Sequence, residues 1–389
     1  MQKPLPTNFP VIALSFLNLI LIIDQFTPTF FEVKGYQVYI CKYFYKMSDK
    51  KRGILLMNLG SPDSTATKDV RRYLNEFLMD SRVIDMPYLK RALLVQGIIV
   101  PFRAPKSAEA YKTIWTDKGS PLVVMTKELQ QKLQEKVTEP VEIAMRYGNP
   151  SPVTGFDRLL EREPALEEVI AVPLYPHYAM SSYETAVEHA KETHKKNKYP
   201  FTLKFVKPYY NHEAYINALA DSMRPYISGD YDLILFSYHG VPGRHIRKSD
   251  PTGCHCLQTE NCCEVSSPAH ATCYRHQCFT TTRLVTEKLN IPLNKYSISF
   301  QSRLGKGWLE PFTDIRLEQM PKEEIKKLLI LCPAFVSDCL ETLEEIAIRG
   351  KEAFMAAGGE TYKMIPCLNV NPLWVDALKQ LVSEAEKSG

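Results

Sequence analysis

The sequence lacks a block of one charge sign, a long apolar run and an internal repeat, and each absence excludes a class of protein. Its 48 Lys and Arg nearly balance 44 Asp and Glu, and this net charge of +4 disfavours a nucleic-acid partner. Glycine (17) and proline (27) are too few for a fibrous or disordered chain. No repeat of solenoid or propeller period is visible. The 389 residues, 45% apolar, instead predict a globular protein of about two domains.

The first 46 residues differ in composition from the rest of the chain. An apolar run over residues 11–23 ends at Asp24 and is shorter than the roughly 18–20 residues that span a bilayer. We expect Met47 to be the natural start, so that residues 1–50 form an extension outside the fold. A membrane-surface anchor and a signal peptide are the alternatives for the extension.

The ten cysteines are unevenly distributed, because six of them lie within residues 254–278. Disulfide frameworks belong to small secreted domains and not to one segment of a large chain. The distribution therefore favours a cytoplasmic protein with a local cluster of thiolates, and dense thiolates favour a soft metal centre.

From residue 53 onward, short apolar runs alternate with longer amphipathic ones. Apolar runs without polar alternation, separated by helices, are typical of parallel sheets that are buried on both faces. The predicted strands are residues 53–59, 141–146, 169–175, 203–206, 233–238, 296–300, 328–332 and 362–365. The clearest helical patterns are residues 69–79, 126–137, 181–198, 278–289, 337–349 and 372–387. We therefore predict an α/β fold of two doubly wound lobes, residues 51–200 and 201–389, with a boundary near residues 199–210.

In such folds ligands bind beyond the carboxyl ends of the strands, so the polar residues after each apolar run are the candidates. Gly60, after the first strand, permits a tight turn, but the turn lacks the second glycine and the lysine of a phosphate loop. Arg146 and Tyr147 follow the second strand and either hold a carboxylate or belong to a structural ion pair. His177 follows the third, where a lone histidine is usually structural.

His239 is the strongest single candidate. A strand carries it out of the sheet, and glycine and proline turn the chain directly after it. An imidazole in this place accepts a proton or binds a metal near neutral pH, unless backbone partners satisfy it.

A row of carboxylates follows the strand over residues 328–332. Ser337 or Asp338 is expected to cap a helix on which Asp338, Glu341 and Glu345 share one face. These carboxylates either complement the helix dipole or form a path for a divalent cation.

The motifs together resemble the ferrochelatase family, whose members insert ferrous iron into a porphyrin as the last step of haem synthesis. The resemblance covers residues 51–389 apart from a cysteine-rich insert at 250–278. The matching stretches are GILLMNLGSP (53–62), the run from Arg103 through YKTIW to GSPL (111–122), MRYGNPS (145–151), PLYPHYA (173–179), SYHGVP (237–242), FQSRLGKGWLEPFTD (300–314), LCPAFVSDCLETLEEI (331–346) and IPCLNVNP (365–372).

The resemblance implies two similar lobes with a porphyrin cleft between them. His239 and Glu341 match the catalytic, metal-binding pair that faces across the cleft, and Glu345 matches the next carboxylate on the metal route. The positions around the macrocycle are matched by Asn58, Arg146, Tyr147, Ser302 and Trp308. A cleft that buckles the ring exposes the pyrrole nitrogens, so that ferrous iron enters protoporphyrin IX as two protons leave. Either member of the pair delivers iron while the other removes protons.

Some members of this family carry a [2Fe–2S] cluster, which makes the cysteine insert a candidate cluster site, with structural Zn²⁺ and free thiols as alternatives. The candidate ligands are Cys254, Cys256, Cys263 and Cys273, and Cys262 is able to replace Cys263. The expected partners are the porphyrin and ferrous iron, with no nucleic acid. Because the substrate is apolar, we also expect peripheral contact between this cytoplasmic protein and a membrane.

Two other functions remain open from the sequence. A related chelatase would insert cobalt or nickel into a different tetrapyrrole with the same fold. A non-catalytic haem- or iron-binding protein would retain the fold without His239 or Glu341, and the sequence contains both.

Overall fold

The structure, a computed structural model, describes residues 31–33, 36–38, 50–302 and 307–387. The chain divides into two units, Met1–Asp49 and Lys50–Gly389. In the first unit, β1 (Phe31–Val33) and β2 (Tyr36–Val38) form an antiparallel pair. The expectations about the apolar run at 11–23 and about Met47 lie outside the described residues.

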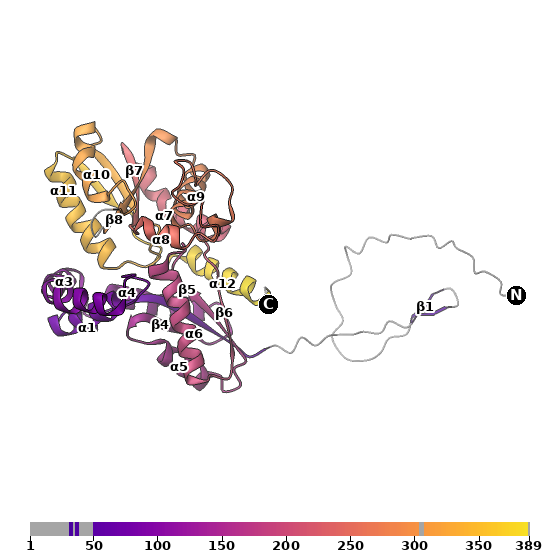
Figure 1. Ribbon diagram of the computed structural model, residues 1–389. Coiled ribbons are helices and arrows are strands. Elements are labelled where there is room, and N and C mark those ends of the chain that lie inside the picture. The colour runs from indigo at the N-terminus through magenta and orange to yellow at the C-terminus, as the bar shows by residue number, and fades with distance from the viewer. Residues whose placement is uncertain (1–30, 34–35, 39–49, 303–306, 388–389) are drawn as a thin grey trace. The chain divides into compact units, whose positions relative to one another are not determined.

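The second unit contains two four-stranded parallel sheets (Figure 1). Their strands are β3 (Arg52–Ser61), β4 (Val141–Gly148), β5 (Glu168–Pro173), β6 (Thr202–Phe205), β7 (Leu233–His239), β8 (Tyr296–Gln301), β9 (Lys327–Leu331) and β10 (Thr361–Met364). The strand orders are β4-β3-β5-β6 and β10-β9-β7-β8. In both sheets the first strand along the chain lies between the second and the third, so the two sheets share one topology. The predicted doubly wound α/β fold and all eight predicted strands are confirmed.

The helices that flank the first sheet precede residue 200. They are α1 (Thr67–Leu78), α2 (Tyr88–Leu94), η1 (Val95–Ile99), α3 (Val100–Ile114), α4 (Pro121–Gln134), α5 (Pro152–Arg162), η2 (Met180–Glu184) and α6 (Thr185–Asn197). Helix α4 begins five residues before the predicted helix at 126–137, because Pro121 occupies a first-turn position that needs no backbone N–H.

The helices that flank the second sheet follow residue 200. They are α7 (Glu213–Ile227), α8 (Gly243–Lys248), η3 (Pro268–Ala271), α9 (Tyr274–Lys288), η4 (Leu293–Lys295), α10 (Thr313–Gln319), η5 (Met320–Glu323), η6 (Glu341–Gly350), α11 (Lys351–Ala356) and α12 (Pro372–Lys387). Segments η1, η2 and η6 are π-helical, and the other η segments are 3₁₀-helical.

Both faces of the first sheet are buried, which explains its apolar runs. Along β3, Ile54 and Leu56 join one hydrophobic cluster with residues of α4, whereas Leu55 and Met57 join another with residues of α5 and α6. Side chains alternate between the faces of a strand, so a strand covered on both sides needs apolar residues at every position.

One hydrophobic cluster runs from the first sheet into the second. It includes Ile54 of β3 in the first sheet and Phe236 of β7 in the second sheet. Tyr215 of α7 and Trp374 of α12 belong to the same cluster. Helix α12 packs against α7, α4 and β5, and Figure 1 shows it beside the first sheet. The terminal helix thus contacts both halves of the unit. The division of the fold at residue 200 stays a prediction.

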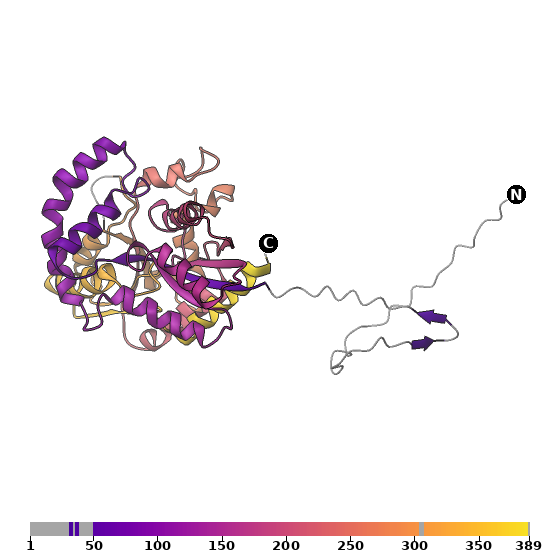
Figure 2. The same cartoon turned by 90° about the horizontal axis from the view of Figure 1, so that it is seen from below.

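Helices α1 and α3, with η1, form a separate cluster at the end of the first sheet far from the C-terminus (Figures 1 and 2). Val70, Tyr111 and the fully buried Tyr147 belong to it, and Leu340 beside η6 packs against it. The second half of the chain therefore touches the first half here as well. Among the described residues, no helix is long and apolar enough to cross a bilayer.

Candidate active site

His239 lies at the carboxyl end of β7, between β8 and β9, where the strand order of the second sheet reverses. Its carbonyl oxygen accepts a hydrogen bond from the Tyr274 hydroxyl at 2.9 Å, and its ring centroid is 6.0 Å from that of Phe335. The chain then turns at Gly240, where a Cβ would lie 2.6 Å from the carbonyl oxygen of Gln301. The backbone around His239 is therefore held on two sides, and the turn requires glycine.

Two opposing effects set the charge of the His239 imidazole. Burial lowers its pKa, the nearby carboxylate of Glu341 raises it, and the Arg103 guanidinium lowers it, with a net result below the ordinary value. The ring is therefore neutral near pH 7 and offers a lone pair. Since Glu341 acts on this imidazole electrostatically, the structure brings the two residues of the predicted pair into one neighbourhood.

Glu341 opens the π-helix η6, and Glu345 lies four residues further along it. Burial and the charge of Glu341 raise the pKa of Glu345 to about 7. The Ser302 hydroxyl donates a hydrogen bond of 2.5 Å to the Glu345 carboxylate. π-helical turns are rare and occur frequently at functional sites. Ser302 also adopts a left-handed backbone conformation (φ 62°), which is uncommon for a residue other than glycine.

The predicted row of three carboxylates is wrong in one member. Asp338 precedes η6, which begins at Glu341, and its carboxylate accepts hydrogen bonds from Thr342 Oγ1 at 2.9 Å and Asn369 Nδ2 at 2.6 Å. The expected side-chain cap is also absent at this helix start, where Leu340 occupies the N-cap position. Asp338 thus ties the start of η6 to the loop that carries Asn369, and it leaves Glu341 and Glu345 as the acidic pair.

Aromatic side chains from α1 and α3 reach Glu341. Burial and then the charge of Glu341 raise the pKa of Tyr111, and burial raises that of Tyr73, with smaller contributions from Tyr111 and Glu341. Sequence reasoning did not assign a role to these tyrosines or to Arg103. Arg103 and Tyr111 do belong to the motif run at 103–122, so the signal was present in the sequence.

Arg146 and Tyr147 are placed in the interior of the first half. Arg146 forms an ion pair with Asp80 and donates to Thr185 Oγ1 at 2.8 Å, and its guanidinium lies 4.2 Å from the centroid of the Tyr147 ring. The hydroxyl of Tyr147 donates to Asp80 at 2.9 Å. This is the structural ion pair that the sequence left open as one of two readings for Arg146.

Asn58 and Trp308 lie near the ends of strands β3 and β8. The amide of Asn58 is buried and donates to Thr126 Oγ1 of α4 at 3.0 Å, so its side chain is engaged within the first half. Trp308 forms a β-bridge with Pro242, just after His239, and its ring would lie 3.4 Å from a Cβ at Gly240. Trp308 is thus placed beside the His239 turn, whereas the Asn58 side chain is bonded to α4 within the first half.

Three thiols of the cysteine-rich insert are linked by hydrogen bonds, and all three belong to the expected set. Cys273 is the centre: a hydrogen bond from the Cys263 thiol lowers the pKa of Cys273 to about 6, and Cys256 also donates to it. Cys262 lies close enough to contribute to the raised pKa values of Cys256 and Cys263, and its Sγ accepts a hydrogen bond from the Leu257 backbone N–H at 3.4 Å. Cys254 instead is exposed, with its Sγ 3.9 Å from Thr252 Oγ1.

Imidazoles surround these thiols but are already engaged. His255 and His270 contact the carbonyl oxygen of Cys262 at 2.7 and 3.0 Å, and His276 contacts that of Cys263 at 2.8 Å. Within residues 50–302 and 307–387, no three or more His, Cys, Asp and Glu side chains have the arrangement of a metal-ion site. Hydrogen bonds link the thiols of Cys256, Cys263 and Cys273, so these sulfur atoms lie close together.

His177 is a structural residue, as its position suggested. It is 2% exposed, its Nε2 lies 2.9 Å from Thr281 Oγ1, and burial lowers its pKa to about 3. A ring with so low a pKa stays neutral at any physiological pH.

Comparison with known proteins identifies the family of the chain. The sequence pattern of the ferrochelatase family matches residues 51–386. A ferrochelatase of Pseudomonas fluorescens (strain Pf0-1) is 49% identical over 335 residues, covering 85% of this chain and 97% of that protein. A ferrochelatase of Opitutus terrae is 48% identical over 335 residues, covering 85% of this chain and 96% of that protein.

Two solved structures share the fold. SirB from Bacillus subtilis with Fe³⁺ matches with a TM-score of 0.50 and 12% identity, covering 87% of this chain and 98% of SirB. The sirohydrochlorin chelatase SirB in complex with cobalt matches with the same score and identity, covering 87% and 96%. From its sequence relatives, the chain belongs to the ferrochelatase family, whose enzymes insert iron into a porphyrin in haem synthesis.

Proposed function

We propose that the protein inserts ferrous iron into protoporphyrin IX, releasing two protons and giving protohaem, and that His239 and Glu341 carry the reaction. The observation that supports this most directly is the electrostatic proximity of a neutral imidazole and a carboxylate. The substrate would lie between residues 51–200 and residues 201–389, which we treat as two lobes. The two lobes contribute different groups to it.

A neutral imidazole suits the reaction because iron cannot enter the ring while the pyrrole nitrogens keep their protons. The lone pair of His239 accepts a proton or holds the incoming ferrous ion, and a protonated ring would do neither. The Tyr274 hydroxyl fixes the His239 backbone.

Glu341 and Glu345 form an acidic route on η6. Because the pKa of Glu345 is about 7, this carboxyl group exchanges protons readily near neutral pH. Its hydrogen bond from Ser302 links the route to the segment after β8. Carboxylate oxygens also suit ferrous iron as it passes. We propose that Glu341 lies beside the reacting nitrogens and that Glu345 is the next group outward.

The macrocycle would be held by both lobes. We propose that Trp308 supplies an apolar surface beside His239, since an aromatic face stacks on a flat ring. Ser302 would act through Glu345. Asn58, Arg146 and Tyr147 are engaged by Thr126 and Asp80, so they would support the wall behind the substrate, and a direct contact would require these bonds to open.

We propose that the cysteine insert holds a [2Fe–2S] cluster through Cys256, Cys262, Cys263 and Cys273. Cys256 and Cys263 donate hydrogen bonds to Cys273, and the charge of Cys262 acts on Cys256 and Cys263, so the four would provide the all-sulfur donor set such clusters use. The lowered pKa of Cys273 favours a thiolate. When bound, the cluster would supply a one-electron redox centre. Zn²⁺, the alternative, would use the same donors.

We also propose that the protein meets a membrane surface through α2, η1 and α3. Large apolar side chains are exposed along this stretch: Tyr88, Leu89, Leu93, Ile98 and Phe102. Leu89 is 80% exposed and Phe102 74%, and such patches mark contact surfaces. Lys90, Arg103 and Lys106 lie exposed on the same helices and favour an anionic lipid surface. An apolar substrate dissolved in the bilayer would then be taken up beside Glu341.

We expect His239→Ala to lower the rate of haem formation by at least about 100-fold, since it removes the group that exchanges protons or metal. Porphyrin affinity, measured by fluorescence titration, should change little. The assay follows the visible spectrum of purified protein with ferrous iron and, in separate arms, protoporphyrin IX or coproporphyrin. The control is His212→Ala, a histidine paired with Glu384 away from the site. Near-normal turnover by His239→Ala would refute the assignment.

Glu345→Gln should remove a pH dependence of stability. A carboxyl group whose pKa is higher in the folded state stabilises the fold below its unfolded pKa and loses that contribution as pH rises through 7. Between pH 5 and pH 8 the wild type should lose about 2 kcal/mol relative to Glu345→Gln in urea unfolding. Glu352→Gln, an exposed site on α11, is the control. Parallel pH profiles for wild type and Glu345→Gln would contradict the assignment.

The cluster proposal separates two cysteines. Cys273→Ser should abolish the visible absorption of anaerobically purified protein, whereas Cys254→Ser should keep it, because the Cys254 thiol lies outside the group. Iron and acid-labile sulfide should each count two per chain in the wild type. A colourless wild type that contains zinc would favour Zn²⁺ as the bound metal. Loss of colour in Cys254→Ser would favour the ligand set expected from the sequence, which includes Cys254.

The double variant Leu89→Asp/Leu93→Asp should bind vesicles of phosphatidylcholine and phosphatidylglycerol at least about tenfold more weakly. Insertion of two leucine side chains into the bilayer would contribute several kcal/mol to binding, and the variant loses this contribution. Co-sedimentation of the full chain measures the partition. Leu293→Asp is the matched control, since Leu293 is 83% exposed but lies in η4. Equal partition of the double variant and the control would exclude this surface.

A further inference from the structure

Asp85 joins the two halves of the chain through side chains that have no part in the proposed iron reaction. It lies between α1 and α2, and its side chain is 7% exposed. Arg244 Nε donates to its Oδ1 at 2.7 Å and Lys248 Nζ to its Oδ2 at 2.5 Å. His245 Nε2 lies 3.3 Å from Oδ1. All three partners belong to α8, so one carboxylate of the first half holds a helix of the second half by three nitrogen atoms.

The carboxylate of Asp85 is held in its charged form. Burial raises its pKa, but hydrogen bonds from Lys248 and Arg244 and the charge of His245 lower it by more, so its pKa is well below the ordinary value. An ion pair in water contributes little, whereas a nearly buried carboxylate depends strongly on its charged partners. Loss of either side of this contact is therefore expected to loosen α8.

The backbone on both sides of Asp85 is fixed by α2. The guanidinium of Arg91, a residue of α2 that is 8% exposed, donates to the carbonyl oxygen of Ile84 at 3.2 Å and to that of Met86 at 2.7 Å. These two carbonyl groups flank Asp85 in the chain. Helix α2 also carries the exposed Leu89 of the proposed membrane-contact stretch. Arg91 thus joins the Asp85 carboxylate to that helix.

The other side of the contact lies next to the proposed active site. Helix α8 begins at Gly243, four residues after His239. Pro242 forms a β-bridge with Trp308, and the Gly243 backbone N–H donates to the carbonyl oxygen of Gly307 at 2.8 Å. The start of α8 is therefore bonded to the segment that carries Trp308, and a shift of α8 would move this aromatic side chain.

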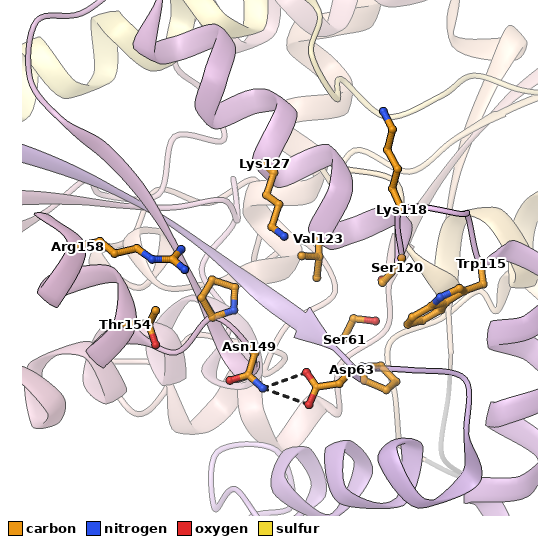
Figure 3. Close-up of a pocket in the computed structure, with 13 residues that line it drawn as sticks. Ser61, Asp63, Trp115, Lys118, Ser120, Val123, Lys127, Asn149, Thr154 and Arg158 are labelled. Atoms are coloured by element: carbon orange, nitrogen blue, oxygen red, sulfur yellow. Dashed lines mark hydrogen bonds between the residues drawn. The ribbon is translucent and has the colours of Figure 1, made fainter. Parts of the chain in front are cut away.

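Asp63 is a useful comparison, because its polar contacts lie within one half of the chain. In the pocket that Figure 3 shows, its carboxylate accepts hydrogen bonds from Asn149 Nδ2 at 3.0 and 3.1 Å, and it pairs with Arg72. All three residues precede residue 200, and the Asp63 side chain is 39% exposed. Asp85 differs on both counts, since it is nearly buried and its charged partners follow residue 200.

We propose that Asp85 is a positioning residue for the porphyrin: it holds α8 to α2 and so keeps Trp308 in the arrangement that binds the macrocycle. The inference rests on the proposed function and adds to it a residue that acts through α8. Without the contact, α8 would occupy several positions, and only the fraction of molecules with α8 in the binding position would take up porphyrin. The porphyrin would bind more weakly, while the bound porphyrin would react at the ordinary rate.

Steady-state haem formation by Asp85→Asn, from protoporphyrin IX and ferrous iron, tests the proposal. The KM for porphyrin should rise at least about fivefold, and kcat should stay within about twofold of the wild type. Arg244→Gln/Lys248→Gln should have a similar effect, and adding Asp85→Asn to it should raise KM little further, because both changes remove the same contact. The control is Glu142→Gln near the start of β4, a carboxylate that is 8% exposed and pairs with Arg162 at 2.8 Å. It should leave KM unchanged.

Two further measurements do not depend on turnover. Fluorescence titration of porphyrin without iron should show the same loss of affinity in Asp85→Asn. Amide hydrogen exchange in residues 241–248 should be at least about tenfold faster in Asp85→Asn than in the wild type and unchanged in Glu142→Gln. These readouts test the role of Asp85 even if the wild type forms no haem, an outcome that would refute the proposed function alone. Urea unfolding midpoints verify that every variant is folded.

Three results would overturn the proposal. The first is unchanged exchange in residues 241–248 of Asp85→Asn, which would mean that the contact does not hold α8. The second is faster exchange with unchanged porphyrin affinity, which would give the contact a structural role only. The third is tighter porphyrin binding by Asp85→Asn, because Arg244 and Lys248, once released from the carboxylate, would then attract the carboxylates of the porphyrin directly.

Discussion

Burial of His239 beside Glu341 has two opposing effects on the pKa of its imidazole. Desolvation disfavours the charged ring, and the carboxylate favours it, and desolvation is the larger effect. The result is a neutral imidazole held beside a carboxylate, although the carboxylate by itself favours the charged ring. Three elements of the second half position the two groups. Strand β7 ends at His239, the Tyr274 hydroxyl donates to the His239 carbonyl oxygen, and Glu341 lies at the start of η6.

The acidic side of the site depends on a departure from regular helix geometry. In an ordinary helix the bonds run from i to i+4, whereas η6 widens to a π-helical pattern from its first residue. Glu341 and Glu345 lie about one turn apart there, and burial together with repulsion by Glu341 raises the pKa of Glu345. Ser302, with its left-handed backbone, completes the contact. Two uncommon backbone conformations thus meet at the carboxylate whose proton is most easily exchanged, which is where strain is commonly found.

The fold was predictable because its strands are covered on both faces. Continuous apolar runs marked all eight strands, and their alternation with helices gave the topology class. His239 was predictable for the same reason, since it is the first polar side chain past a buried strand. The family resemblance was needed for Glu341. A helical period starting at Ser337 led to the error at Asp338, because sequence spacing assumes 3.6 residues per turn and does not reveal a late, π-helical start.

Contacts between side chains that are distant in sequence could not be predicted. Arg146 meets Asp80, which lies 66 residues earlier, and only the folded chain decides whether that arginine faces a partner or a ligand. The cysteine insert has little regular structure, so spacing did not distinguish Cys254 from Cys262.

The continuous core also constrains how a large flat substrate enters. One cluster joins Ile54 of the first sheet to Phe236 of the second, so separating the two sheets would expose apolar surface across both. Helices α1 and α3 belong to a smaller cluster, which meets η6 through Leu340. That cluster has fewer members, and its Tyr73 and Tyr111 lie close enough to Glu341 for the charge of Glu341 to raise their pKa values. Entry of the proposed substrate beside α1 and α3 would therefore disturb the smaller cluster, and these helices adjoin the exposed apolar side chains of α2 and η1.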